Sequence, residues 1–333
     1  MDVIPTYQVR NGEPDKSATS LDLSSEGPAE AYSREGVRLS RSGRHEESVR
    51  WFERAISTDP GYAPAWAGLG HALGKMGRYQ DEIDACEHAI GLDPDLAEAW
   101  VNKAFALGRL ERFEEKIEAC DQAIRADPAH APAWNAKGHA LGELGRFEEE
   151  VACSDIAISL RPRYLGAWVN RGFALMKLKR NSEAIHSFRQ ALRIYPDYLS
   201  AWINCGITLI QDGREAEAIR CLDRAEELSP GNPRVLFWKG LALSRRGRFG
   251  EAIHLMEGLV DQDPRHADAW VVMSNCYFML GKLDESVRCF VVAYGIDKED
   301  IKSCISESVN LIRDGRLDDA IRSISQAFGI LLR

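Results

Sequence analysis

The sequence predicts an all-α protein: a right-handed superhelix, or α-solenoid, of stacked antiparallel helix pairs. Three features of the 333 residues indicate this architecture. Prolines recur every 34 residues, tryptophans recur with the same period, and each period carries two apolar helical stripes separated in most repeats by a glycine. The prolines are Pro60, Pro94, Pro128, Pro162, Pro196, Pro230 and Pro264. The tryptophans are Trp66, Trp100, Trp134, Trp168, Trp202 and Trp270, and Leu236 stands where the series skips a member.

Each repeat is numbered so that its tryptophan is position 4. This gives nine repeats within residues 29–333, beginning at residues 29, 63, 97, 131, 165, 199, 233, 267 and 301. Positions 4, 7, 8 and 11 predict a first helix, and positions 17, 20, 21, 24, 27 and 28 predict a second. The glycine between them, such as Gly77, suits the left-handed conformation that follows a helix C-terminus. Pro64 suits the first turn of a helix, and the pair Asp59-Pro60 ends one.

The pattern resembles the tetratricopeptide repeat family from Ala29 to the end of the chain. Besides the tryptophan and the proline, a small residue at position 8 (Gly70), a leucine at position 11 (Leu73) and an alanine at position 27 (Ala89) carry the resemblance. The resemblance implies that the first helices line a concave groove. Each helix pair leaves an apolar face that only its neighbour can cover, so we expect one continuous array without an internal linker.

The two ends depart from the repeat. Residues 1–28 are acidic and rich in Ser, Asp, Glu and Gly, which predicts a disordered tail. The alternative is a segment that folds into its own or another molecule's groove. The last repeat, residues 301–333, has Cys304 in place of the tryptophan and ends in an apolar stretch. Ile330 and Leu331 either finish packing onto the eighth repeat or form a surface for homo-oligomers.

Composition and motifs exclude several classes. The net charge of −9 argues against a general binder of nucleic acid or anionic membranes. The chain contains no run of about 18 apolar residues, so membrane insertion is not expected. Residues near Met1 form no apolar segment of the kind found in signal peptides, and we therefore expect a cytoplasmic protein. No phosphate-binding loop or nucleophile elbow is present, which predicts a protein that is not an enzyme and holds no cofactor.

The eight cysteines fall mostly at core positions and predict buried, reduced thiols. Cys153, Cys221 and Cys289 share position 23 but lie two repeats apart, too far for disulfides. His71 and His139 share position 9, also two repeats apart, so no metal site is expected.

The predicted groove is unusually apolar at positions 5 and 9. Either a protein or peptide partner covers these residues, or they pack between adjacent first helices on the inside of a tight curve. The candidate binding residues of this kind are His71, Phe105, His139, Phe173, Ile207 and Phe237. A row of asparagines resembles the asparagine ladder of O-linked N-acetylglucosamine transferase, which grips a peptide main chain. Its members are Asn102, Asn170 and Asn204 at position 6 and Asn135 one place earlier, and Ala136 breaks the row.

Repeats 2 to 4 differ from repeats 5 to 7 at two linked positions. Position 20 holds a long charged residue in the earlier repeats, where the later ones have alanine; these residues are Glu82, Lys116 and Glu150. Position 12 is glycine in the same repeats, at Gly74, Gly108 and Gly142. We expect the glycines to make room for the charged side chains, which would form a ladder of ion pairs between repeats. The alternative is that the glycines open the groove for a peptide main chain. A basic residue at position 16 of every repeat is expected to complement the dipole at the end of the first helix.

The sequence therefore favours a non-enzymatic adaptor that binds an extended peptide or a partner helix in its groove. The alternatives are a self-assembling structural element and a regulatory subunit of a separately encoded enzyme. The fold alone does not choose among them.

Overall fold

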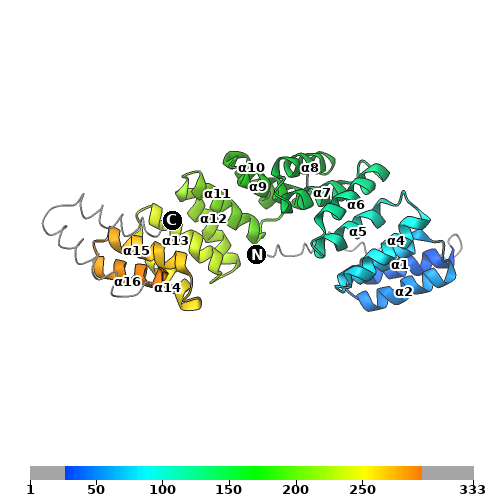
Figure 1. Cartoon of the computed structure of the whole chain (residues 1–333), viewed down its shortest axis with the longest axis horizontal. Coiled ribbons are helices and arrows are strands. Elements are labelled where there is room, and N and C mark those ends of the chain that lie inside the picture. The colour runs from blue at the N-terminus through cyan, green and yellow to red at the C-terminus, as the bar shows by residue number, and fades with distance from the viewer. Residues whose placement is uncertain (1–26, 295–333) are drawn as a thin grey trace. The chain divides into compact units, whose positions relative to one another are not determined.

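The computed structural model describes residues 27–294, which form sixteen α-helices in eight antiparallel pairs (Figure 1). The first helices of the pairs are α1 Pro28–Arg41, α3 Ala63–Lys75, α5 Ala97–Arg109, α7 Ala131–Glu143, α9 Leu165–Lys177, α11 Leu199–Gln211, α13 Pro233–Arg245 and α15 Ala267–Met279. The second helices are α2 His45–Thr58, α4 Tyr79–Leu92, α6 Phe113–Ala126, α8 Phe147–Leu160, α10 Asn181–Ile194, α12 Glu215–Leu228, α14 Phe249–Gln262 and α16 Leu283–Tyr294. The predicted all-α fold of repeated helix pairs is confirmed.

Most of the predicted N-terminal tail and the whole ninth repeat lie outside the described residues. Pro28 is the first residue of α1, and residues 1–26 of the predicted tail are not described. The ninth repeat, with Cys304, Ile330 and Leu331, also lies outside the described residues. Between residues 27 and 294, no helix is both long and apolar enough to cross a membrane.

The turn within each pair follows from its glycine. Gly77 adopts φ +79°, and its N–H donates to the carbonyl of Gly74 over 3.0 Å. The N–H of Arg78 donates to the carbonyl of Leu73, also over 3.0 Å, so the last carbonyls of α3 are satisfied. Two repeats lack this glycine. Glu111 and Lys179 take its place, both at φ 59°, a conformation that costs a residue with a side chain about 1–2 kcal/mol.

The basic residue at position 16 does not cap the first helix, which corrects the dipole argument made from the sequence. It is the residue before the first turn of the second helix, where the positive end of the dipole disfavours a cation. Its partner is an acidic side chain three residues later, for example Asp81, which lies 2.6 Å from Arg78. The same pairing occurs in seven described repeats, from Arg44–Glu47 to Arg248–Glu251.

The shared period of tryptophan and proline has a direct cause. The indole Nε1 of Trp66 donates a hydrogen bond to the carbonyl oxygen of Pro60 over 3.1 Å. The other five tryptophans of the series make the same bond to the proline six residues earlier, over 2.7–3.0 Å. These hydrogen bonds connect the first helix of a repeat to the proline at the end of the preceding repeat. Leu236, which lacks a donor, leaves this bond out after Pro230.

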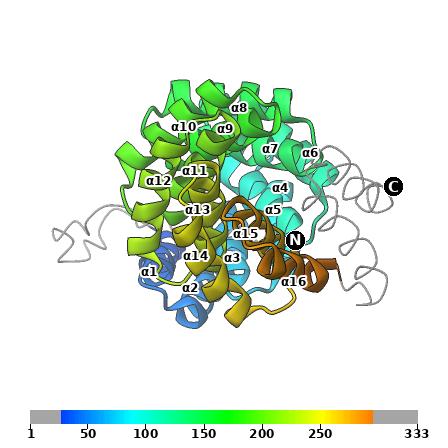
Figure 2. The ribbon, with the colours of Figure 1, turned by 90° about the vertical axis from the view of Figure 1, so that its left-hand side faces the viewer.

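The chain divides into two compact units, Met1–Leu144 and Gly145–Arg333. In the described part of the first unit, α1 to α7 pack in chain order, and α1, α3 and α5 also pack against the next first helix. The second unit, with α8 to α16, follows the same rule, and Figure 2 shows α9, α11 and α13 next to one another. Because first helices approach each other while second helices do not, each stack curves toward its first helices, as the resemblance implied.

Small residues at position 8 let the two helices of a pair approach. In the second unit, a Cβ added to Gly172 would lie 2.7 Å from the Phe188 ring, which is fully buried. The equivalent contact in the second repeat joins Gly70 to the much smaller Cys86, at 2.8 Å from its Sγ. Repeat 2 therefore has spare volume beside its glycines, and the long side chain at position 20 uses it.

Candidate functional site

The first unit places two candidate groove residues on an exposed surface. His71 on α3 and Phe105 on α5 are both exposed, and 40% of the surface of Phe105 is accessible. The ammonium of Lys75 lies 5.7 Å from the centroid of the Phe105 ring, close enough for a cation–π contact. Surrounding protein atoms and the positive charge of Lys75 lower the pKa of His71. This part of the first-helix face thus combines an apolar ring, a cation and an imidazole that is neutral at pH 7.

Asn102 fastens neighbouring first helices together. Its Nδ2 donates a hydrogen bond to the carbonyl oxygen of Ala67 on α3 over 3.2 Å, and its side chain also hydrogen-bonds His71. Both partners belong to the preceding repeat, so a peptide main chain would have to displace these bonds in order to use this amide. Asn135 on α7 is half-buried.

His139 lies next to a buried lysine. The ammonium of Lys116 on α6 is 3.3 Å from Nδ1 of His139, and Nε2 of His139 is 3.8 Å from an oxygen of Glu143. Burial, together with the charge of Lys116, lowers the pKa of His139 to about 4. The imidazole is therefore neutral at pH 7, and Nδ1 can accept a hydrogen bond from the ammonium. Lys116 is only 7% exposed, and burial lowers its pKa as well.

The steric part of the prediction for position 20 is confirmed in repeats 2 and 3. A Cβ added to Gly74 would overlap the carboxyl of Glu82, at 2.0 Å from Oε2, and one added to Gly108 would lie 3.0 Å from Nζ of Lys116. The ion-pair ladder is wrong for its first step, because Oε2 of Glu82 is buried without a hydrogen-bond partner and Glu82 forms no ion pair with Lys116. Burial raises the pKa of Glu82 to about 8, so the carboxyl is mostly protonated at neutral pH. Glu150, the third residue of the predicted ladder, lies in the second unit, Gly145–Arg333.

In the second unit, the candidate residues separate into surface and core. Phe173 on α9 is half-buried, with the ammonium of Lys177 5.1 Å from its ring centroid. Ile207 on α11 is only 6% exposed and packs with Ile203 and Val235. The structure favours the packing alternative at Ile207, because Trp202, Trp238 and Met176 close over this cluster.

The remaining candidates of the second unit are half-buried. Phe237 on α13 packs edge-on against Trp238, with ring centroids 5.2 Å apart, and lies 5.3 Å from the imidazole of His266. Asn170 on α9 and Asn204 on α11 are half-buried. The structure therefore offers Phe173 as the counterpart, in the second unit, of Phe105 in the first.

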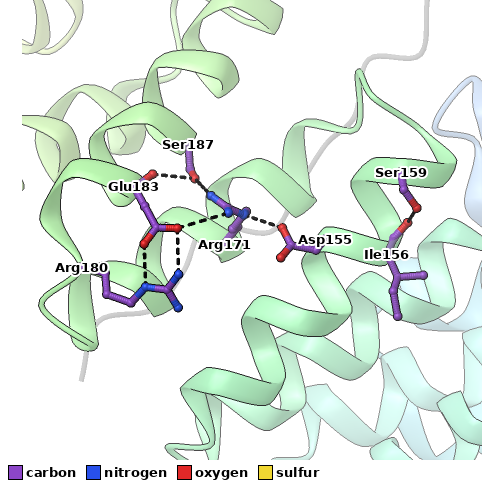
Figure 3. A network of polar contacts seen from close by, with 7 residues as sticks. All are labelled: Asp155, Ile156, Ser159, Arg171, Arg180, Glu183 and Ser187. Carbon is purple, nitrogen blue, oxygen red and sulfur yellow. Dashed lines mark hydrogen bonds and ion pairs between the residues drawn. The ribbon is translucent and has the colours of Figure 1, made fainter.

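A set of ion pairs between repeats was missed from the sequence. A basic residue at position 7 contacts an acidic residue at position 25 of the preceding repeat over 2.6–2.7 Å. The four pairs are Lys103–Glu87, Lys137–Asp121, Arg171–Asp155 and Lys239–Asp223. Figure 3 shows the third of them, in which Arg171 also donates to the hydroxyl of Ser187. The sequence pattern places position 7 on the apolar stripe of the first helix. Comparing position 7 of each repeat with position 25 of the repeat before it reveals the linked charges.

Two further features of the described residues bear on other kinds of site: possible metal ligands and surface hollows. Among the described residues, no three His, Cys, Asp or Glu side chains cluster in a way that could hold a metal ion. One surface hollow of about 470 Å³ lies between α14, α15 and α16, with Trp270 and Tyr277 in its wall, and contains none of the candidate groove residues.

Comparison with known proteins supports the resemblance. Sequence profiles described as tetratricopeptide repeat match residues 29–164, in four consecutive repeats, and residues 157–236. A profile of subunit 3 of the anaphase-promoting complex, or cyclosome, matches residues 211–292. No curated protein sequence matches this chain.

Solved structures share the fold at low sequence identity. YrrB, described as a TPR protein with an unusual peptide-binding site, is 22% identical, with 57% of this chain and 98% of YrrB covered and a TM-score of 0.50. PilF of Pseudomonas aeruginosa is 20% identical, with 63% and 96% covered and a TM-score of 0.57. The Cut9–Hcn1 tetramer of the anaphase-promoting complex is 16% identical, with 74% and 49% covered and a TM-score of 0.59. These structures share the fold, and the sequence profiles that match residues 29–164 and 157–236 show that the chain belongs to the tetratricopeptide repeat family.

Proposed function

We propose that the protein is a non-enzymatic adaptor whose first-helix faces bind extended peptide segments of protein partners. The observation that carries the proposal is the exposed ring of Phe105 with the ammonium of Lys75 beside it. Phe173 and Lys177 repeat the arrangement in the second unit. An aromatic ring on the inner face of a curved stack has no further repeat to cover it, so a ligand is its natural partner.

The chemistry of this face favours one class of peptide. The ring offers an apolar contact, and Lys75 places a cation beside it. We therefore expect segments in which an apolar or aromatic side chain is followed or preceded by a carboxylate. Asn102 can bind a peptide main chain only if the ligand displaces the hydrogen bond from Asn102 to the Ala67 carbonyl. YrrB is a fold relative with a described peptide-binding site, which supports peptide binding as a use of this architecture.

The test is selection from a displayed library of random peptides on the full chain, followed by fluorescence anisotropy of the selected peptides. We expect Phe105→Ala or Phe173→Ala to weaken binding at least tenfold, since buried aromatic contacts dominate such interfaces. Tyr195→Ala is the matched control, because this ring is 50% exposed at the end of α10, away from the first helices. Selection of no peptide, or equal binding by Phe105→Ala, Phe173→Ala and the control, would overturn the proposal.

A further inference from the structure

Two buried cysteines of the sixth repeat face each other. Cys205 on α11 and Cys221 on α12 have their sulfur atoms 4.0 Å apart. Cys205 is fully buried, and Cys221 is 9% exposed. None of the seven described cysteines forms a disulfide. The pair joins positions 7 and 23 of one repeat, whereas the cysteines that share position 23 lie two repeats apart.

The residues around the pair depart from the pattern of repeats 3, 4, 5 and 7; repeats 2 and 8 have Leu69 and Met273 at position 7. In repeats 3, 4, 5 and 7, position 7 is basic and contacts an acidic residue at position 25 of the repeat before. In repeat 6, position 7 is Cys205 and the preceding position 25 is Arg189, which contacts Glu217 over 2.8 Å instead. Both members of the pair have changed, and the change puts a guanidinium where a carboxylate would stand. A cysteine that merely replaced a buried side chain would not require that exchange.

The environment distinguishes the two thiols. The hydrogen bond that joins the two thiols, together with the nearby Arg189 and Arg220, lowers the pKa of Cys221. The same hydrogen bond, together with burial, raises the pKa of Cys205. Cys221 is thus the more exposed residue of the pair, and the two arginines favour its thiolate. A thiolate beside a second thiol, close to cations, is the arrangement found in reactive cysteine pairs.

We propose that Cys205 and Cys221 are a redox-sensitive dithiol, which a peroxide oxidises to a reversible disulfide between α11 and α12. The thiolate of Cys221 attacks one oxygen of hydrogen peroxide, so that an S–O bond forms and the O–O bond breaks. The hydroxide released takes up the proton that Cys221 had lost. The sulfur of Cys205 then attacks the sulfenic acid; the S–S bond forms, the S–O bond breaks, and the Cys205 proton leaves with the hydroxide as water. Two thiols and one peroxide thus give one disulfide and two waters.

The bond would act on the helix that carries Asn204 and Ile207. The sulfurs must approach from 4.0 Å to about 2.05 Å, which requires new side-chain torsions of the two cysteines or a closer approach of α11 and α12. Cys205 lies on α11 between Ile203 and Ile207, two members of the cluster under Trp202 and Trp238. Oxidation is therefore expected to alter the packing of this cluster on the first-helix side of the second unit.

The test is oxidation of the folded full chain with hydrogen peroxide, followed by trypsin digestion and mass spectrometry. Cleavage at arginine puts Cys205 in residues 194–214 and Cys221 in residues 221–224, so the disulfide joins two peptides that are otherwise separate. We expect this linked pair, with the loss of two of the eight thiols, and its disappearance on reduction with dithiothreitol. Circular dichroism of the oxidised sample shows whether the chain is still folded.

Variants separate the dithiol from ordinary buried cysteines. Cys205→Ser should leave Cys221 to accumulate as a sulfenic acid, which dimedone labels, and Arg189→Gln should slow oxidation while Arg189→Lys restores it. Cys153→Ser is the matched control at the same repeat position as Cys221, and it should leave the linked peptide unchanged. The proposal is overturned if no linked peptide forms in the folded chain, if it forms only in urea, or if Cys153 oxidises as fast as Cys221.

Discussion

The buried carboxyl of Glu82 makes the stability of the second repeat depend on pH. Its side chain is 1% exposed, and burial raises its pKa from 4.5 to about 8. Between these two values the folded chain holds a proton that the unfolded chain has lost. Since the folded-state pKa is raised, the free energy of unfolding is highest below pH 4.5 as far as this group is concerned. It then decreases as pH rises toward 8, by about 1.4 kcal/mol per pH unit.

The expected effect follows from that slope. From pH 6 to pH 7.5, Glu82 should lower the free energy of unfolding by about 2 kcal/mol, an order-of-magnitude figure. Glu82→Gln keeps the shape of the side chain and cannot ionise, so it should abolish this part of the pH dependence and be the more stable protein at pH 8. Other groups titrate equally in both proteins, and the difference between them isolates Glu82.

Hydrogen exchange is the suitable measurement, because long repeat arrays do not unfold as a single two-state unit. Exchange of the amides of α3 and α4 is followed by mass spectrometry at pH 6 and pH 8, after correction for the intrinsic pH dependence of exchange. The exposed Glu98→Gln is the control, and it should leave the protection of these helices as in the unmodified chain. Equal pH dependence of protection in Glu82→Gln and the unmodified chain would refute the reasoning.

Three further predictions concern the framework of the repeats. Gly74→Ala should destabilise by about 1–3 kcal/mol, because its Cβ would overlap the buried carboxyl beneath it, whereas Gly91→Ala, with open space around it, should stabilise by up to about 1 kcal/mol. Glu111→Gly should stabilise by about 1 kcal/mol, since glycine adopts φ 59° without strain. Trp134→Phe should destabilise by at least about 1 kcal/mol through the lost bond to a proline carbonyl. Hydrogen exchange of the amides of the helices concerned checks all three, and a reversed order of the two alanine variants would contradict the first.

The repeated helix pairs could be predicted because every level of the sequence agrees. The tryptophan at position 4 and the proline at position 32 share a period because the indole of one bonds the carbonyl of the other, as Trp100 bonds Pro94. The glycine at position 15 fixes the turn in the same register. These are local signals of short range, and each one is repeated, so an exception such as Leu236 does not obscure them.

The candidate site could be predicted less well, because exposure on the first helices depends on which side chains meet across repeats. Phe105 and Ile207 occupy the same repeat position, yet one is 40% exposed and the other 6% exposed. The difference comes from their neighbours: Trp202 and Trp238 cover the cluster around Ile207. Periodicity assigns a residue to a face of its helix, and only the neighbouring repeats determine whether that face is open.

Comparison between repeats of the same chain recovers part of what periodicity misses. The glycine at position 12 and the long residue at position 20 change together, and the structure shows the contact that links them, as between Gly108 and Lys116. Position 7 and the preceding position 25 are likewise linked where position 7 is basic, and in repeat 6 Cys205 and Arg189 replace the charge pair. The sign of a charge, however, does not establish its partner: Lys116 and Glu82 have opposite signs, yet each is held in the interior of its own helix pair, where burial rather than pairing sets its pKa. A linked change between repeats therefore predicts contact, and the chemistry of that contact has to be read from the space around it.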